Sequence, residues 1–434
     1  MTIERAAPRA RRAPARAPAP RRRGIFAILG PGLITGASDD DPSGIATYSQ
    51  AGAQFGTGLV WSLLFTYPLM VCIQEISGRI GRVTGRGIAG NLCRNYPLPV
   101  VYAIVGLLLL ANIINLGADL GAMAASLQLL IGGPRLLFVF LFGVGSALLQ
   151  VFIDYSRYAS LLKWLCLSLF SYVATVFVVD VPWGQVLHDV VVPHVTLDNA
   201  ELTVLVAVFG TTISPYLFFW QASEEVEEIK EDPKAKPLKQ AEEQAPAEFE
   251  RIRLDTYAGM AFSNIVALFI MVTTAATLHA HGTTDIQTSA DAAQALRPIA
   301  GDFAFALFAL GIIGTGLLAV PVLAGSAAYA LAETCHWPAG LGKKPSRAKA
   351  FYATIAGATA LGILVNLSTL DPMKALFWSA VINGIVAVPV MVMMMLMTAH
   401  RSVMGDFTLP PVLRIGGWLA TAVMALAAVA MLVT

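Results

Sequence analysis

Charged side chains are scarce along this chain. Only 13% of its 434 residues are Asp, Glu, Lys or Arg, whereas 56% are hydrophobic. A soluble domain is usually about one quarter charged and no more than about half apolar. Because the deficit of charge extends along the chain, the composition excludes an ordinary soluble domain and indicates that lipid is the solvent for most of it.

Cysteine is also scarce, and it is scattered. The four residues are Cys72, Cys93, Cys166 and Cys335, and no two of them have the close spacing of a metal-binding or redox pair. This pattern argues against a zinc cluster and against a disulfide framework. We interpret the four cysteines as single packing residues.

The N-terminal residues lack the apolar core of a cleaved signal peptide. Residues 1–23 are instead rich in Arg, Ala and Pro, a composition that buries too little apolar surface to fold. We expect a disordered cytoplasmic arm, suited to contact anionic lipid head groups. No aromatic residue lies between its arginines, so nucleic-acid binding is the weaker interpretation.

Long apolar runs fill the rest of the chain. A helix needs roughly 20 apolar residues to cross the hydrocarbon of a bilayer. The sequence therefore predicts an all-α integral membrane protein with about eleven spans. They are expected at 25–54, 57–78, 98–129, 135–153, 159–180, 201–226, 256–280, 301–332, 350–369, 373–399 and 412–433.

The basic residues between the spans predict the orientation. Lys and Arg concentrate after the second, fourth, sixth, eighth and tenth spans, and the loop 227–253 is the most highly charged. By the positive-inside rule these loops and the N-terminal arm are cytoplasmic, and an odd number of spans places Thr434 outside. We expect a multi-pass protein of the plasma membrane in which 227–253 is a solvated connector.

The first span contains three consecutive aspartates. It reads GPGLITGASDDDPSGIATYSQAGA, so that Asp39, Asp40 and Asp41 precede Pro42 and Gly44. Each ionised Asp costs about 2.5–3.5 kcal/mol at the centre of a membrane helix, and proline breaks the helix. Broken backbone at this depth must be buried in protein or line a watery cavity. The alternative, that the span ends at Ser38 and a loop follows, leaves 25–38 too short to cross.

The sixth span also contains a proline beside polar residues at its centre. Pro215 lies at the centre of LTVLVAVFGTTISPYLFFWQASEE, after Thr211, Thr212 and Ser214. Proline leaves the carbonyl four residues earlier without its helical partner, here that of Thr211. A free carbonyl beside hydroxyl groups is a hard oxygen site for a cation. The alternative for this span alone is an ordinary proline kink.

The two breaks open two sets of five spans, which we assign to residues 24–182 and 200–400, with an extra terminal helix in 401–434. Two odd-numbered sets in succession must be inverted relative to each other. Discontinuous helices at corresponding positions of inverted halves are the best indication in a sequence of a transport site.

Other polar residues lie within spans. Asn112, Asn115 and Asp119 share one face of the third span, and Asn383-Gly384 is expected to interrupt the tenth. For the two asparagines of the third span, hydrogen bonding between helices and substrate contact remain alternatives. Asp119 is the stronger candidate, because an intramembrane carboxylate is usually functional.

These residues resemble the Nramp family of divalent-metal transporters. The stretch from Gly30 to Gly56 is similar to the family's GP…DPGN…QAGA signature, and GTTISPYLFF is similar to its GA-x-x-MPH motif. The resemblance implies two inverted five-helix repeats, as in sodium-coupled amino-acid transporters, with discontinuous helices 1 and 6. It also implies that no cofactor is needed, because the metal is the substrate.

The departures from the family motifs suggest a harder cation. The family's metal-binding Asp is kept as Asp41, but its Asn corresponds to Gly44, its Met to Ser214 and its carbonyl-donating Ala to Thr211. Losing the thioether removes a preference for soft metals, and losing the amide widens the site. A roomy, all-oxygen site suits partly hydrated Mg²⁺. The same departures resemble the Nramp-related magnesium transporter branch.

The residues that handle protons in the family are altered as well. Its histidine on the sixth helix corresponds to Tyr216, and its glutamate on the third helix to Ala122. Histidine changes charge near neutral pH, whereas a phenol with an ordinary pKa of about 10 does not. We therefore expect transport without obligatory proton coupling.

The sequence thus predicts a transporter that moves Mg²⁺, and also Mn²⁺, into the cytoplasm by alternating access. The alternatives are a proton-coupled manganese or iron importer, a sodium–solute symporter and a receptor that transports nothing. An intramembrane aspartyl protease is disfavoured because no GxGD motif is present.

We expect no enzyme activity, no binding of nucleic acid and no required protein partner. Asp39 and Asp40 are assigned to an outer vestibule. The candidate metal-site residues are Ser38, Asp40, Asp41, Gly44, Asp119, Thr211, Ser214 and Asn383.

Overall fold

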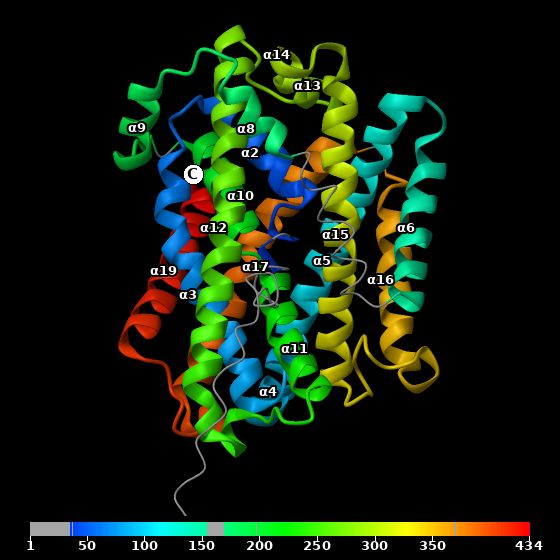
Figure 1. Ribbon diagram of the computed structural model, residues 1–434, viewed down its shortest axis with the longest axis vertical. Coiled ribbons are helices and arrows are strands. Elements are labelled where there is room, and N and C mark those ends of the chain that lie inside the picture. Colours follow the sequence, from blue (N-terminus) through cyan, green and yellow to red (C-terminus); the bar gives the residue numbers. More distant parts are fainter. Residues whose placement is uncertain (1–34, 37, 154–168, 197, 369) are drawn as a thin grey trace, which may run out of the picture.

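The computed structural model describes residues 35–36, 38–153, 169–196, 198–368 and 370–434. Every regular element in these ranges is a helix, so the expected all-α fold is confirmed (Figure 1). The predicted arm at 1–23, the first part of span one, the first half of span five and Cys166 lie outside the described residues.

The helices follow one another along the chain with short connections. The first half contributes α2 (Pro42–Phe55), α3 (Trp61–Thr84), α4 (Ile88–Asn95), α5 (Leu98–Ile131), α6 (Arg135–Phe152), α8 (Phe170–Val176) and α9 (Trp183–Val191). The second half contributes α10 (Asn199–Thr212), α11 (Pro215–Glu231), α12 (Ala245–Thr277), α13 (Ser289–Ala293), α14 (Arg297–Ala300), α15 (Ala304–Thr334), α16 (Lys349–Val365), α17 (Pro372–Ala399), α18 (Arg401–Met404) and α19 (Pro411–Val433).

Seven stretches of the described chain are long and apolar enough to cross a membrane, and they make this a multi-pass membrane protein. They are Leu98–Ile131, Arg135–Phe152, Asn199–Glu231, Glu242–His281, Ser289–Thr334, Pro372–Ala399 and Pro411–Val433. The four other expected spans correspond to α2, α3, α8 and α16. Of these, α2 and α16 are short, α8 is described only in part, and α3 carries polar residues such as Glu75 in its second half.

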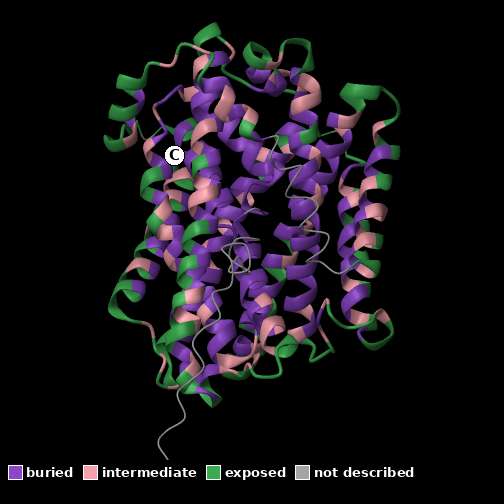
Figure 2. Ribbon diagram, in the orientation of Figure 1, coloured by how far each residue is buried: buried purple, intermediate pink, exposed green. Residues whose placement is uncertain are grey.

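The helices with the breaks lie inside the bundle. In Asn199–Glu231, which contains α10 and α11, 94% of the most apolar stretch is buried, compared with 28% for α6 and 28% for α19. Figure 2 shows the same gradient, with buried ribbon in the middle of the bundle and exposed ribbon at its margins. The polar groups at the breaks are therefore shielded from lipid by the outer helices.

A glycine contact presses α10 against α17. A Cβ on Gly210 would lie 2.0 Å from the Ala380 carbonyl oxygen, and a Cβ on Gly384 would lie 2.6 Å from that of Val206. Only glycine allows this approach of two backbones. The expected interruption of span ten at Asn383-Gly384 is therefore wrong: α17 is continuous, and Gly384 serves its packing against α10.

The connections with many basic residues gather at one end of the bundle. The α3–α4, α11–α12, α15–α16 and α17–α19 connections lie at the lower end in Figure 1, whereas α9, α13 and α14 lie at the upper end. The charge pattern that separated odd from even loops in the sequence thus coincides with a spatial division of the molecule.

Candidate functional site

The first helix is broken where the aspartates meet proline. Ser38 and Asp39 are helical, Asp40 lies in a bend, and α2 begins at Pro42. Asp41 caps α2, because its Oδ1 accepts a hydrogen bond of 2.7 Å from the Gly44 backbone N–H. The expected discontinuity is confirmed, and it leaves the second oxygen of Asp41, Oδ2, directed toward other helices.

The sixth helix is broken at the position predicted. α10 ends at Thr212, α11 begins at Pro215, and Ser214 in the gap has an extended backbone. The Ser214 hydroxyl lies 2.6 Å from the Gly210 carbonyl oxygen and 2.9 Å from that of Thr211. The expectation that the Thr211 carbonyl has no partner is therefore wrong, because the serine hydroxyl replaces the amide that proline removed. One lone pair of that oxygen still remains for another contact.

Three other helices converge on Asp41. The Asn115 amide on α5 donates to Asp41 Oδ2 over 3.0 Å, and Ser379 Oγ on α17 donates to Asn115 Oδ1 over 2.8 Å. The Tyr216 hydroxyl on α11 lies 3.4 Å from the same Oδ2 and 3.1 Å from the Ser38 carbonyl oxygen. Tyr216, on the helix that follows the break in helix six, thus contacts residues on both sides of the break in helix one.

A second contact joins the two breaks. Thr211 Oγ1, at the end of α10, is hydrogen-bonded to the Tyr48 hydroxyl on α2 over 3.0 Å. Both side chains are buried. The broken parts of helices one and six are therefore connected through hydroxyl groups, which can both donate and accept hydrogen bonds.

Asp39 and Asp40 lie on a different side from Asp41. Ser263 Oγ on α12 is 2.5 Å from Asp39 Oδ2 and 3.1 Å from Asp40 Oδ1. Both aspartates are buried, with 0% and 2% exposure. The pair packs inside the bundle against α12. Its assignment to an outer vestibule stays a prediction, because Asp41 is buried to the same extent.

Two further candidates are buried without a hydrogen-bond partner. Neither carboxylate oxygen of Asp119 on α5, and neither polar atom of the Asn383 side chain on α17, has a partner within the described residues. Asp119 lies one helical turn after Asn115, and Asn383 lies one turn after Ser379, so each pair shares a helix face. Unpartnered buried polar groups are costly, so these two side chains have capacity to contact an ion or water that enters this region.

No basic side chain neutralises these carboxylates within the described part of the chain. The ion pairs found there involve none of Asp39, Asp40, Asp41 and Asp119. No group of three or more His, Cys, Asp and Glu side chains in the described ranges forms a ready metal cage either. The groups found around Asp41 are amide, hydroxyl and carbonyl groups, which are neutral.

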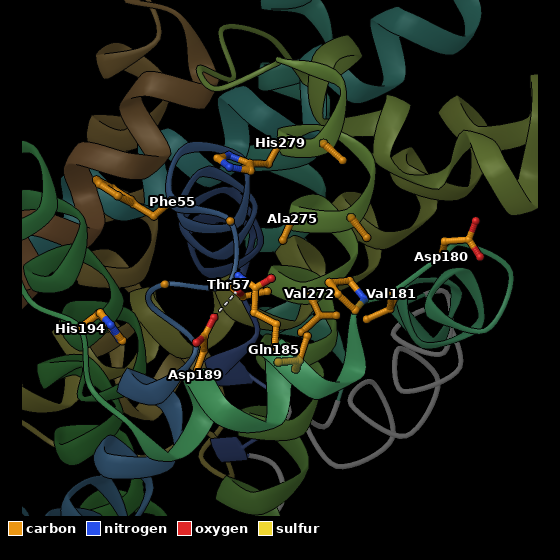
Figure 3. A pocket seen from close by; sticks show the side chains of 16 residues that line it. Phe55, Thr57, Asp180, Val181, Gln185, Asp189, His194, Val272, Ala275 and His279 are labelled. Atoms are coloured by element: carbon orange, nitrogen blue, oxygen red, sulfur yellow. Dashed lines mark hydrogen bonds between the residues drawn. The ribbon is translucent and has the colours of Figure 1, made fainter.

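Two cavities flank the upper half of α2. One, of about 300 Å³, lies between α2 and the start of α17 and is lined by Gln50, Gln54, Lys374 and Trp378, among others. The other, of about 460 Å³, lies between the end of α2, α9 and the end of α12 (Figure 3). Asp189 faces Thr57 there. Neither cavity is lined by Asp41, so neither is the candidate cation site itself.

Several site residues were not among the sequence candidates. The sequence leaves Asn115 between two interpretations and indicates Tyr216 only as the replacement of a histidine. It gives no reason to select Ser379 or Ser263. The spacing of Asn115 and Asp119 did indicate a shared face. Nothing in the sequence indicates which helix a given serine meets, because that depends on packing between distant segments.

The sequence matches a known family along most of its length. Residues 32–434 match the family described as natural resistance-associated macrophage protein-like, or Nramp. The divalent metal cation transporter MntH of Klebsiella pneumoniae (strain 342) is 26% identical over 407 residues, covering 92% of each chain. MntH of Aeromonas hydrophila is 25% identical over 417 residues, covering 93% of this chain and 94% of its own.

Solved structures share the fold. A manganese transporter of Eremococcus coleocola, in complex with an aromatic bis-isothiourea substituted compound, aligns with a TM-score of 0.72 at 17% identity, over 93% of this chain and 85% of its own. The inward-facing form of Mhp1 aligns with a TM-score of 0.53 at 14% identity, over 93% and 90%. The family match covers far more than half of the sequence, and the chain therefore belongs to the Nramp family.

Proposed function

We propose that this member of the Nramp family carries divalent metal ions across the membrane as its substrate, with Asp41 as the main carboxylate ligand. One observation carries the proposal: a buried carboxylate at a helix break has hydrogen-bond donors from two other helices and no basic partner in the described part of the chain. A buried negative charge of this kind requires a cation. The family consists of transporters rather than enzymes, and the metal is cargo rather than a cofactor.

The remaining ligands come from both breaks. The Thr211 carbonyl has one lone pair left beside its contact with Ser214, and Gly44 adds no side chain that would narrow the site. Asn383 and Asp119 have buried polar atoms without a hydrogen-bond partner in the described residues, and in this proposal they contact the cation directly or through water. Asp40 and Asp39 attract the cation through their electrostatic field rather than by a direct bond, because both side chains are hydrogen-bonded to Ser263. Ser38 contributes its carbonyl as the anchor for Tyr216.

Mg²⁺ is the preferred substrate in this proposal, and Mn²⁺ is also carried. The groups around Asp41 are carboxylate, amide, carbonyl and hydroxyl, and the position of the family's thioether holds the Ser214 hydroxyl. Hard oxygen donors suit Mg²⁺, which keeps several waters, whereas soft ions such as Cd²⁺ gain from sulfur.

Transport proceeds by alternating access between two inverted five-helix repeats, 24–182 and 200–400, with residues 401–434 as an added helix. The orientation places the basic loops and the N-terminus in the cytoplasm and Thr434 outside, and transport needs no obligatory proton. The cavity between α2 and α17 supports a path for the cation from the outer side. It extends along α2 as far as Ala46, about one helical turn from the end of α2 that carries Asp41. Gln50 closes its margin by hydrogen bonds to Thr284 O and Ile286 N.

The proposal is tested by cation flux into liposomes that contain the purified protein, with Mg²⁺, Mn²⁺, Ca²⁺ and Cd²⁺ compared. We expect Mg²⁺ and Mn²⁺ to enter and Ca²⁺ to enter poorly. Ser214→Met restores sulfur at the second break and should raise the ratio of Cd²⁺ to Mg²⁺ flux about tenfold, because soft ions prefer soft ligands. Ser223→Met on the same helix, α11, is a matched control without effect on the ratio.

Absence of flux for all four cations would refute the proposal. An unchanged ratio of Cd²⁺ to Mg²⁺ flux in Ser214→Met would refute only the preference for hard cations and would leave the transport function standing. A second candidate, a proton-coupled manganese or iron importer, is favoured by one observation, the buried and unpartnered carboxylate of Asp119. The same liposomes distinguish the two if the internal pH is followed during metal entry.

A further inference from the structure

The Asn115 amide is placed to do more than hold two helices together. Its Nδ2 donates to Asp41 Oδ2 over 3.0 Å, and its Oδ1 accepts from Ser379 Oγ over 2.8 Å. The side chain is fully buried. One oxygen of Asp41, Oδ1, is held within α2 by the Gly44 N–H at 2.7 Å. The other, Oδ2, is directed at Asn115 and Tyr216 on neighbouring helices, so it is the oxygen that an ion between these helices would meet.

The spacing between Asn115 and Asp41 matches two ligands of one small ion. Mg²⁺ binds oxygen at about 2.0–2.1 Å in octahedral geometry, so neighbouring ligand oxygens lie about 2.9 Å apart. The separation found here is 3.0 Å. If the amide turns by half a rotation about its last bond, Oδ1 replaces Nδ2 and two oxygens stand at the edge of a magnesium octahedron.

The empty and the filled site require opposite orientations of this amide. Without a cation, the NH₂ group must face the carboxylate, because two oxygens at this distance repel each other. With a cation between them, the carbonyl oxygen must face inward. The amide group of asparagine has the same shape in both orientations, with donors on one side and an acceptor on the other.

Ser379 accommodates both orientations. Its hydroxyl lies 2.8 Å from Asn115 Oδ1 and 2.7 Å from the Leu376 carbonyl oxygen. When Asn115 turns, the hydroxyl proton goes to Leu376 and the Ser379 oxygen accepts from the amide NH₂. The turn therefore leaves no buried polar group of these residues without a partner, which would otherwise cost about 1–3 kcal/mol.

We infer that Asn115 is a ligand of the transported cation and sets its size selectivity, by turning its amide from Asp41 to the ion when the site fills. This inference rests on the proposed function. It also explains how the site functions with Gly44, which has no side chain to supply an amide from α2: the amide comes from α5. Ca²⁺ fits an octahedral arrangement of these ligands less well, because its longer bonds of about 2.3–2.6 Å would then separate neighbouring oxygens by about 3.3–3.7 Å.

The test is cation uptake into liposomes by the full-length protein, with Asn115→Ala and Asn115→Asp compared with wild type. Asn115→Ala should raise the KM for Mg²⁺ by about tenfold or more, as loss of metal-site groups does elsewhere, and should lower the Mg²⁺ to Ca²⁺ ratio. Asn115→Asp keeps an oxygen and should keep Mg²⁺ affinity within about threefold or better. Asn112→Ala is the control: Asn112 is one turn away, contacts Leu323 and Ser326, and should change the KM less than about twofold.

A rescue variant separates ligation from positioning. Gly44→Asn in the Asn115→Ala background returns an amide to α2, where a Cβ would lie 3.3 Å from the edge of the Tyr48 ring, 3.4 Å from the Asp39 carbonyl oxygen and 3.5 Å from Asp41 Oδ1. The double variant should recover at least half of the lost affinity on a logarithmic scale. If Asn115→Ala lowers kcat with an unchanged KM, Asn115 only positions Asp41 and the inference fails.

Folding and function are checked in the same samples. Should Asn115→Ala fail to fold, the rise in Tm with added Mg²⁺ in Asn115→Asp decides: a rise like that of wild type supports ligation, and its loss contradicts it. If wild type itself carries no divalent cation, the proposed function fails. If wild type carries Mg²⁺ and Asn115→Ala does so with unchanged KM and selectivity, the inference alone fails.

Discussion

At the scale of single residues, three consecutive aspartates have different surroundings. Asp41 faces Asn115 and Tyr216, whereas Asp39 and Asp40 share the Ser263 hydroxyl. Neighbouring residues of a helix point about 100° apart, so one ion meets all three only if the backbone unwinds completely. The break at Asp40 is too short for that, and the three carboxylates divide between two sides of the first helix.

This division predicts unequal effects of substitution. Asp41→Ala should reduce Mg²⁺ uptake about a hundredfold or more, because removing one member of a buried charged pair costs about 3 kcal/mol. Asp39→Asn keeps the shape and the contact with Ser263, and should keep the KM for Mg²⁺ within about threefold. Initial uptake rates at varied Mg²⁺ provide both values. Full uptake in Asp41→Ala together with loss in Asp39→Asn would reverse the assignment.

Some of the site residues could be predicted from the sequence, and others could not. Asp41 and both prolines were found because charge and proline are costly in a membrane helix wherever they occur. The partner of the Thr211 carbonyl was missed, because a serine three residues later can replace a lost amide only if its rotamer turns back onto the helix. Asn115 remained undecided because its role depends on α2 and α17, which are distant in the sequence.

At the scale of elements, α2 is a half-helix held at both ends. Its upper end is held by His279, whose Nδ1 is 2.8 Å from the Ala53 carbonyl oxygen, and by Asp189 of α9, whose Oδ2 accepts from Thr57 Oγ1 over 2.5 Å. Figure 3 shows these side chains around one cavity. Because Asp41 caps the other end of α2, these contacts help to set the position of Asp41, the proposed cation ligand.

The contact between Asp189 and Thr57 predicts a dependence of stability on pH. Burial raises the pKa of Asp189, but hydrogen bonds from Thr57 and His188 and the nearby His188 imidazole outweigh it, so the pKa lies below its ordinary value. A depressed carboxyl pKa stabilises the fold above the unfolded pKa of about 4, and this contribution is lost as the pH falls through the folded value. The other titratable side chains around the cavity are Asp180, His194 and His279.

Asp189→Asn should therefore lower the stability at pH 7 by about 1.5 kcal/mol, the contribution of a hydrogen bond to a charged group. The difference in Tm from wild type should shrink below about pH 4. Thermal unfolding in detergent measures it, with Asp180→Asn as a control, since Asp180 is exposed in the same cavity. A difference that is constant from pH 7 to pH 3 would contradict this origin.

Element boundaries followed from the sequence where one residue fixes them and failed where packing decides. Proline begins α2 and α11 as expected, since it suits the first position of a helix. Gly384 was expected to break span ten but lies inside the continuous α17, because the glycine is required by contact with α10 rather than by a turn. A glycine in a sequence does not reveal which of these two requirements it meets.

At the scale of the whole molecule, the basic loops occupy one end of the bundle, and this predicts which end is cytoplasmic. A cysteine introduced at Lys236, in the exposed α11–α12 connection, should react with an impermeant maleimide only after cells are opened. A cysteine at Asp302, near α14 at the opposite end, should react in intact cells. Labelling of the Lys236 position from outside would invert the orientation proposed here.

The whole molecule also determines what energy is available for transport. A divalent ion that moves inward across about 100 mV, negative inside, gains roughly 4.6 kcal/mol, twice the value for a single charge. Since each 1.4 kcal/mol corresponds to about tenfold, this gain supports more than a thousandfold accumulation. Uptake of Mg²⁺ therefore does not require a proton, provided that the path through the protein is open to the ion in alternation from each side.

The site itself offers few groups to carry a proton with the metal. By the resemblance of the motifs, the family's histidine corresponds to Tyr216, whose hydroxyl contacts Ser38 and Asp41, and its glutamate corresponds to Ala122. Asp119 is the exception, because its carboxylate is buried close to these groups without a hydrogen-bond partner in the described residues. Asp119 is therefore the first side chain to test for proton transfer, ahead of Asp39 and Asp40, which are hydrogen-bonded to Ser263.

We predict passive transport, driven by the membrane potential and the metal gradient. In liposomes with a clamped potential and an internal pH dye, Mg²⁺ entry should leave the luminal pH unchanged and should rise as the interior is made more negative. Asp119→Asn removes the one aspartate of this group with neither carboxylate oxygen hydrogen-bonded in the described residues, and it should keep the charge moved per Mg²⁺ at two, even if the rate falls. Luminal acidification that follows Mg²⁺ entry in wild type and disappears in Asp119→Asn would show instead that Asp119 carries a proton with each metal ion, and the manganese or iron importer would then be the better description of this protein.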